Sequence, residues 1–267
     1  MAGAVSGLIG SSRSSLYTTG GTAYTQGNYN GVYFLSSGTF TIINGVRDIE
    51  VLVVAGGGGG GGGAHNFTYG YNSAGGGGAG ALANNTTIVN APLGNYTITV
   101  GGGGAGGARA VNGGFGTFIQ GNQGGTGNTS SILTPAAVTI SRTGPAGGGG
   151  GFVYYPYGFS GGTGSGNGTY SGTNGYNGSA ANGGGGGAGA GSNASALVTY
   201  YVGALGGNTT TVMNTFGKGG DGGNWNSRNA TSGYQGSGGA GGSGANDASF
   251  GPGSVGTGGI VYLRWLK

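Results

Sequence analysis

Residues 49–63 read IEVLVVAGGGGGGGG, an apolar run that passes without a break into eight glycines. The run is rich in β-branched residues and predicts a β-strand. A glycine run on its own would be a flexible linker, because glycine loses much conformational freedom on folding and buries almost no apolar surface. We therefore expect the glycines to be held by backbone hydrogen bonds between extended segments, which glycine allows to approach very closely.

The composition of the chain excludes several classes of protein. Glycine accounts for 79 of the 267 residues, and charged residues for 4%, against about 25% in typical soluble domains. The eight Lys and Arg residues are scattered and form no basic cluster, so we expect no nucleic-acid partner. The chain has no cysteine, which excludes disulfides and thiolate metal sites.

Targeting signals are not apparent in the sequence. The first ten residues lack the charged start and continuous apolar stretch of a secretory signal, and no run approaches the length that spans a bilayer. We expect a protein made in a cytoplasm and not inserted in a membrane.

A few sharp strand signals stand out between the glycine runs. Residues 38–43 and 48–55 flank Asn44-Gly45, so the pair predicts a β-hairpin. Further strands are predicted at 95–100, 136–142 and 259–265, and no segment has a capped helical period. Strands from both ends of the domain favour a small sheet or sandwich at its base.

Glycine recurs at intervals of three in several places, for example at Gly121, Gly124 and Gly127. Three residues per turn is the period of the polyproline II helix, whose backbone is free to bond to neighbours. Collagen shares this conformation but needs strict glycine spacing and much proline, and this chain has five prolines. A bundle of polyglycine II helices is the arrangement we expect.

These signals together predict an all-β and partly irregular fold. Its base would be a small β-sheet or sandwich from about residues 39–55, 95–100, 136–142 and 258–266, and the polyglycine bundle with its loops would lie between them. Residues 39–267 would form this glycine-rich domain. Residues 1–38 are a Ser-, Thr- and Tyr-rich lead, which we expect to be an attachment segment or an extra strand.

Segments dense in aromatic and amide residues interrupt the glycine runs, and each would be a loop at the end of the bundle. Aromatic rings offer a large contact area at low entropic cost and stack on sugar faces, so they are our candidate receptor-binding residues. Alternatively, the rings pack over the bundle or at a subunit interface. The candidates are Phe67, Tyr69, Tyr71, Tyr154, Tyr155, Tyr157, Phe159, Tyr170, Tyr176, Trp225 and Tyr234.

Four elements follow one another in a fixed order along the chain. They are Val-Leu-Val-Val-Ala at 51–55, Tyr-Thr-Ile-Thr-Val-Gly at 96–101, Gly-Asn-Thr-Ser-Ser-Ile at 127–132 and Gly-Gly-Ile-Val-Tyr-Leu-Arg-Trp at 258–265. In this order of elements, from about Phe40 to its end, the chain resembles the glycine-rich domains of bacteriophage tail fibres and tail-fibre-tip adhesins. The resemblance implies that packed polyglycine helices hold variable loops against a receptor on the bacterial surface.

Catalytic machinery is sparse in the sequence. The chain has one histidine, His65, and four acids, Asp48, Glu50, Asp221 and Asp247. General acid–base catalysis needs two positioned groups, metal sites need convergent ligands, and a phosphate-binding glycine loop needs a helix behind it. We therefore expect no enzymatic activity, no cofactor and no metal.

The leading interpretation is a virion protein, a tail fibre or tip adhesin, that binds a bacterial surface glycan or outer-membrane protein and contacts other virion proteins. The alternative is a purely structural virion component, such as a head fibre, decoration or adaptor protein. Ice binding is a third class, which the lack of cysteine and the bulky loops disfavour. Both a homotrimer and a monomer remain open.

Overall fold

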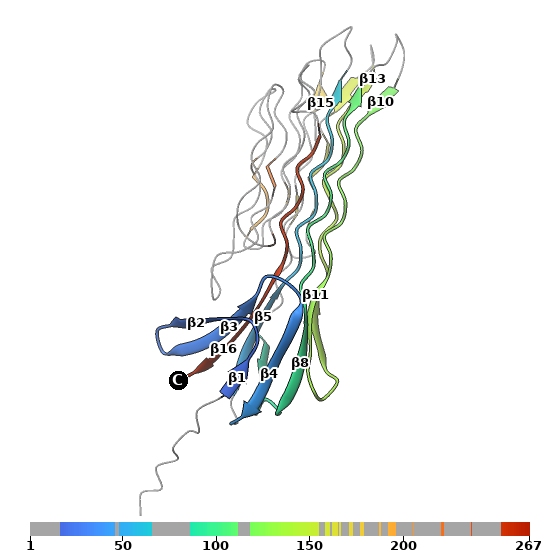
Figure 1. Cartoon of the computed structure of the whole chain (residues 1–267). Helices are drawn as coiled ribbons and strands as arrows, with labels where there is room; N and C mark the ends of the chain where they lie inside the picture. Colours follow the sequence, from blue (N-terminus) through green and yellow to red (C-terminus); the bar gives the residue numbers. More distant parts are fainter. Residues whose placement is uncertain are drawn as a thin grey trace, which may run out of the picture.

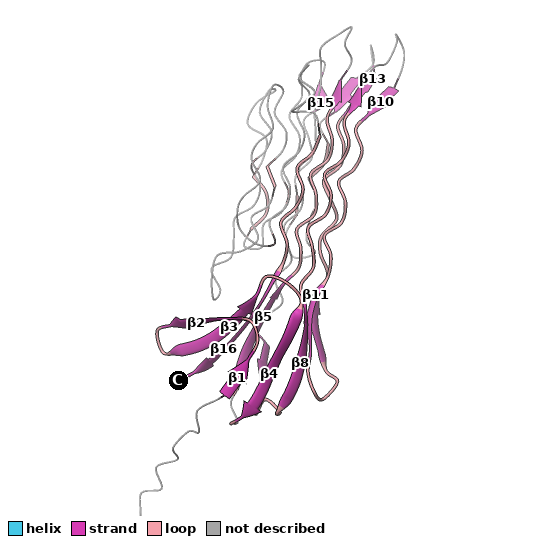
Figure 2. Cartoon of the chain, viewed as in Figure 1, coloured by secondary structure: helices cyan, strands magenta, loops and turns pink. Residues whose placement is uncertain are grey.

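The computed structural model describes residues 17–45, 48–65, 86–111, 118–154, 158–160 and 252–267, together with short pieces between them. Those pieces are residues 162–164, 166, 171–172, 177–178, 187, 192–195, 205, 220–221 and 236. The regular elements of this part of the chain are all β-strands (Figure 2). The all-β class predicted from the sequence is confirmed.

Ten strands form the base of the molecule, and six short strands lie elsewhere. The base strands are β1 (Tyr17–Thr19), β2 (Thr22–Gln26), β3 (Tyr29–Phe34), β4 (Gly38–Asn44), β5 (Ile49–Val54), β7 (Thr86–Ile88), β8 (Gly94–Thr99), β11 (Ser130–Leu133), β12 (Thr139–Arg142) and β16 (Ile260–Leu266). The other strands are β6 (Ala64–His65), β9 (Ala110–Val111), β10 (Phe118–Gln120), β13 (Phe152–Tyr154), β14 (Gly158–Ser160) and β15 (Asn177–Gly178).

The base is a sandwich of two five-stranded antiparallel sheets. The first sheet has the order β1-β4-β8-β11-β12, and the second has the order β2-β3-β16-β5-β7. Strands from the two ends of the chain pair within the second sheet, where β16 lies between β3 and β5. The last strand therefore closes the sandwich.

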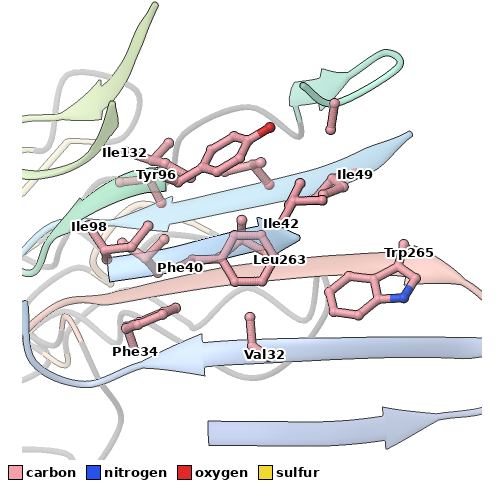
Figure 3. Packing of buried hydrophobic residues seen from close by; sticks show 14 residues of the cluster. Val32, Phe34, Phe40, Ile42, Ile49, Tyr96, Ile98, Ile132, Leu263 and Trp265 are labelled. Atoms are coloured by element: carbon pink, nitrogen blue, oxygen red, sulfur yellow. The ribbon is translucent and has the colours of Figure 1, made fainter. Parts of the chain in front are cut away.

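The hydrophobic core fills the space between the two sheets (Figure 3). Alternate residues of β5 and β16 point inward, and β4, β8 and β11 supply the facing side chains. Phe40 and Tyr96 have ring centroids 5.7 Å apart, and Trp265 packs 6.2 Å from Phe40. The buried set is Val32, Phe34, Phe40, Ile42, Ile49, Val51, Val53, Ala91, Tyr96, Ile98, Ile132, Val261, Leu263 and Trp265.

The outer face of the second sheet carries a separate aromatic cluster. Tyr33 and Tyr262 stack with ring centroids 5.4 Å apart, and Tyr24 packs edge-on against Tyr262 at 5.5 Å. Leu52 and Val54 of β5 are buried on this same face. The strand β5 is thus apolar on both faces, as its uninterrupted apolar sequence requires.

The predicted hairpin of residues 38–43 and 48–55 is wrong. These residues form β4 and β5, which lie in different sheets: β4 pairs with β1 and β8, and β5 pairs with β16 and β7. A strand apolar on both faces needs neighbours on both edges and cover on both faces. The short connection after Asn44, in which Gly45 has a φ of +88°, therefore carries the chain from one sheet to the other.

The lead of residues 1–38 contributes three strands to the sandwich. Strands β1, β2 and β3 of the lead belong to the two sheets, with β3 paired to β16 and β1 paired to β4. Residues 1–16 lie outside the described residues.

The strand expected at residues 136–142 is shorter in the structure. Strand β12 begins at Thr139, because residues 134–138 form a turn in which Ala137 has a φ of +60°.

Glycine-rich segments leave the sandwich side by side and extend away from it (Figure 1). We call them the glycine bundle: a central segment, residues 56–63, and four outer segments, residues 101–109, 121–129, 144–151 and 252–259. In the order given, the five segments are continuous with strands β5, β8, β11, β12 and β16 of the sandwich. Hydrogen-bond registers make 101–109 and 144–151 parallel to the central segment and the other two antiparallel.

Hydrogen bonds in the bundle recur at every third residue. Gly56, Gly59 and Gly62 donate their N–H groups to the carbonyls of Asn128, Gly125 and Asn122, at 2.9–3.0 Å. The central segment makes such backbone bonds with all four outer segments. Burial follows the same period: residues 101, 104 and 107 are buried, whereas residues 102, 105 and 108 are exposed.

The close approach of these backbones explains the glycine content. A Cβ atom on Gly56, Gly58, Gly59, Gly61 or Gly62 would lie 1.9–2.4 Å from a backbone carbonyl oxygen of an outer segment. Carbonyl groups that are held in the hydrogen-bonded network of the bundle cannot move aside as a side chain can. Outer segments carry side chains such as Ala105, Asn122 and Thr126 at exposed positions.

Candidate binding surface at the distal end of the bundle

Short strands lie at the end of the bundle opposite the sandwich (Figure 1). The strand β6 follows the central segment, β9 follows segment 101–109, β10 precedes 121–129 and β13 follows 144–151. The distal sheet has the order β10-β13-β14-β15, and β6 pairs in parallel with β9. The bundle therefore ends in a surface built from several chain reversals.

Two of the candidate receptor-binding residues lie in this distal sheet. Tyr154 is in β13, opposite Phe118 of β10 and Gly158 of β14. Phe159 is in β14, opposite Val153. The neighbouring strands β10 and β13 thus place Phe118 directly opposite Tyr154, on the face of the sheet that also holds position 152, whereas position 159 lies on the other face.

Phe118 and Phe152 share this sheet, although they were not among the candidate site residues. Phe152 is half-buried and pairs with Gln120 and Ser160. The apolar pair Phe118-Ile119 directly before a glycine-containing run was the available sequence signal. The remaining candidates lie outside the described residues: Phe67, Tyr69, Tyr71, Tyr155, Tyr157, Tyr170, Tyr176, Trp225 and Tyr234.

A family model for a glycine-rich domain matches residues 35–266. The chain belongs to this glycine-rich domain family. No curated protein matches its sequence. Strands β1, β2 and β3 precede the matched region, yet they complete the sheets of the glycine-rich domain.

The acidic residues described in the glycine-rich domain have local partners. Glu50 accepts hydrogen bonds through Oε2 from Nε of Arg264 at 2.9 Å and from Nη2 at 2.6 Å. Asp48 accepts a hydrogen bond from the backbone N–H of Asn90 at 2.8 Å.

No group of three or more His, Cys, Asp or Glu residues that could hold a metal ion converges within the described residues. Within the same residues, no helix has the length and apolar character to cross a bilayer.

The opposite end of the glycine-rich domain exposes a group of large apolar side chains. They lie at strand ends of the sandwich that point away from the bundle, at the end of β4 and of β16 and before β8 and β12. Each of these residues exposes between 44% and 66% of its surface to solvent. We call this group the apolar base: Ile43, Val89, Leu93, Val138 and Leu266.

Proposed function

We propose that the protein is a non-enzymatic bacteriophage virion protein, a tail fibre or its tip adhesin, that binds a receptor on the bacterial surface. One observation carries the proposal: a sheet at the end of the bundle farthest from the sandwich holds the aromatic positions Phe118, Phe152 and Tyr154 on one face and Phe159 on the other. A receptor would meet this end first. Aromatic rings suit both the faces of sugars and the apolar patches of an outer-membrane protein.

The glycine bundle would serve as the rigid arm that carries the distal sheet. We infer that its segments are polyglycine II helices. The hydrogen-bond step of three residues supports this conformation, since it equals the polyproline II period. The positive-φ glycines of the described residues lie outside the five bundle segments, and this is compatible with the same conformation.

The protein would be made in the cytoplasm of the infected host and assembled into the virion, where it would contact other virion proteins. Assembly as a homotrimer and assembly as a monomer are both compatible with the proposal. The proposal assigns no cofactor, no nucleic-acid partner and no membrane insertion.

Segment exchange tests the proposal directly. Residues 152–160 and, separately, residues 224–234 would be replaced by unrelated sequences of equal length in the phage. We expect altered adsorption to bacterial host strains that differ in their surface receptor. Assembled particles should still form. The matched control replaces the exposed turn of residues 134–138 in the sandwich, which should leave host range unchanged. Unaltered adsorption after both exchanges would overturn the proposal.

A purely structural virion component is the second candidate, and the apolar base favours it. Five exposed apolar side chains at one end of the molecule are typical of a contact surface in an assembly. This candidate requires the distal sheet also to be covered by neighbouring subunits. Electron microscopy of particles with a tag inserted after Phe159 distinguishes the two, since an adhesin leaves the tag at a free end.

A further inference from the structure

A recess of about 420 Å³ opens in the sandwich at the inner face of strands β2 and β3. The inner side chains of β2, Ala23 and Thr25, are exposed, so the first sheet does not cover this part of the second sheet. Val32 and Trp265, which also line the recess, are 5% and 7% exposed. The recess therefore lies at the margin of the core. The strands that line it are at the opposite end of the molecule from the distal sheet (Figure 1).

Three of the lining residues form a single row across adjacent strands. Thr25 of β2 is the cross-strand partner of Asn30 in β3, and Asn30 is the partner of Trp265 in β16. Cross-strand partners share one face of a sheet, so a hydroxyl, an amide and an indole lie in line on the inner face. The Phe40 ring packs against Trp265 and fixes the indole.

Two further lining residues, Tyr24 and Gly31, are oriented differently from this row. Tyr24 and Gly31 are cross-strand partners one position along from this row, so their side-chain directions point to the outer face. A Cβ atom on Gly31 would lie 2.6 Å from the Tyr24 ring, which places that ring on the outer face. The Tyr24 side chain therefore does not fill the recess.

The polar groups of the recess are uncharged. Thr25 Oγ1 donates a hydrogen bond to Asn30 Oδ1 at 3.3 Å, and this leaves the amide N–H groups of Asn30 free for a ligand within the described part of the chain. The nearby charged pair, Arg264 and Glu50, lies on the outer face, where the guanidinium covers the Tyr29 ring at 4.4 Å. An ionised ligand would find no counter-charge among the lining residues.

We propose that this recess binds a neutral sugar ring, in addition to any receptor bound at the distal sheet. A pyranose has an apolar face that suits Ala23 and the small exposed parts of Val32 and Trp265, and hydroxyl groups that suit Thr25 and Asn30. The volume lies in the usual range of small-molecule sites. The glycine-rich domain would then have a second carbohydrate subsite in its base.

Intrinsic fluorescence tests the proposal, because the chain has two tryptophans, Trp225 and Trp265. In the Trp225→Phe variant, emission reports on Trp265 alone. Titration with glucose, N-acetylglucosamine and maltose should give a saturable change with at least one of them, at millimolar dissociation constants. Cyclohexanol, a ring of similar size with one hydroxyl, should give no saturable change. A saturable cyclohexanol response of equal affinity would show a general apolar recess and overturn the proposal.

Variants in the same background assign the response to the recess. Thr25→Val and Asn30→Leu should each weaken sugar binding at least tenfold, and Ala23→Phe, at an exposed position, should block it by filling the recess. Thr22→Val is the matched control, since Thr22 lies on the same strand and does not line the recess. No saturable response to any of the three sugars, or full affinity in the Thr25 and Asn30 variants, would overturn the proposal. Neither result bears on the distal sheet, whose exchange variants are tested separately by adsorption.

Discussion

A Cβ atom on Gly59 would lie 1.9 Å from the carbonyl oxygen of Ala105 on the neighbouring segment. Both residues belong to one network, since the Ala105 carbonyl also accepts a hydrogen bond from Gly125, and Gly125 accepts one from Gly59. Three segments meet at this point, and none can move without breaking bonds to the others. A single methyl group at Gly59 therefore tests how rigid the bundle is.

We expect Gly59→Ala to lower the free energy of unfolding by about 1–3 kcal/mol or more, because overpacking a rigid site forces the backbones apart. Gly102 provides the control, since a Cβ there meets its nearest atom, Asn128 Nδ2, at 3.6 Å. Gly102→Ala should raise the free energy of unfolding by about 0.4–1 kcal/mol, because alanine restricts the unfolded chain. Urea unfolding followed by circular dichroism measures both. Equal stability of the two variants would contradict the structure of the bundle.

Amide hydrogen exchange should show the three-residue period. Gly104 and Gly107 donate to Gly57 and Gly60 at 2.8 Å, so their N–H groups should exchange at least about a hundredfold more slowly than exposed amides. In the described residues, Ala105 and Ala108 have no acceptor for their N–H groups and should exchange quickly. Nuclear magnetic resonance resolves these positions individually. Uniform exchange along residues 101–108 would be incompatible with the hydrogen-bond pattern.

Arg264 combines an ion pair with an aromatic contact, and lysine reproduces the charge alone. Two of its nitrogens bind Glu50 Oε2 and its guanidinium covers the Tyr29 ring. We expect Arg264→Lys to lower the free energy of unfolding by about 1 kcal/mol, since lysine cannot supply this planar contact. A double-mutant cycle of Arg264→Met, which removes the charge, with Glu50→Gln should give a coupling energy of about 0.5–1 kcal/mol or more. Strict additivity would show that the ion pair contributes nothing to stability.

Stability should fall in alkaline solution because of two buried tyrosines. Burial raises the pKa of Tyr24 and that of Tyr96 to about 12, against about 10 in an unfolded chain. Between pH 10 and 12 the unfolded chain therefore loses protons that the folded protein retains, so the free energy of unfolding decreases as the pH rises through this window. Below pH 10 these two groups contribute no pH dependence.

Tyr96→Phe separates the contributions. The variant loses the hydrogen bond from the Tyr96 hydroxyl to the Pro92 carbonyl, 2.7 Å long, which should cost about 1 kcal/mol at neutral pH. Its decline between pH 10 and 12 should be less steep than that of the wild type. Unfolding titrations at several pH values provide the measurement, and an unchanged alkaline slope would exclude Tyr96 as a source.

The sequence allowed the strands of the base to be predicted where their patterns were strong. The apolar runs at 49–54 and 260–266 are strands, and Gly121, Gly124 and Gly127 are buried positions three residues apart. Pairing was harder to predict, because the Asn44-Gly45 signal is local and cannot report that β5 needs cover on two faces. Strands β2 and β3 were not predicted, although Gly27-Asn28 between two Tyr-containing runs is a hairpin signal, and Gly27 has a φ of +56°.

Candidate site residues were harder to place than the base. Their composition identified aromatic segments but not which of them share a sheet. Tyr154 and Phe159 turned out to lie in adjacent strands, together with Phe118 from a distant part of the chain. Such register depends on the lengths of the bundle segments that lead to the strands, and no local pattern encodes those lengths.

The three-residue step of the hydrogen bonds also governs how the arm can change length. One residue added after Gly101 would rotate every later position by a third of a turn, so that Gly103 and Gly106 would take the buried positions of Gly104 and Gly107, and two added residues would place Ala105 at a buried position. Three added residues would restore the phase and extend that segment by about 9 Å. Each neighbouring segment would need the same addition to keep its acceptors aligned. Reach is therefore quantised, and it grows in whole turns shared by all the segments.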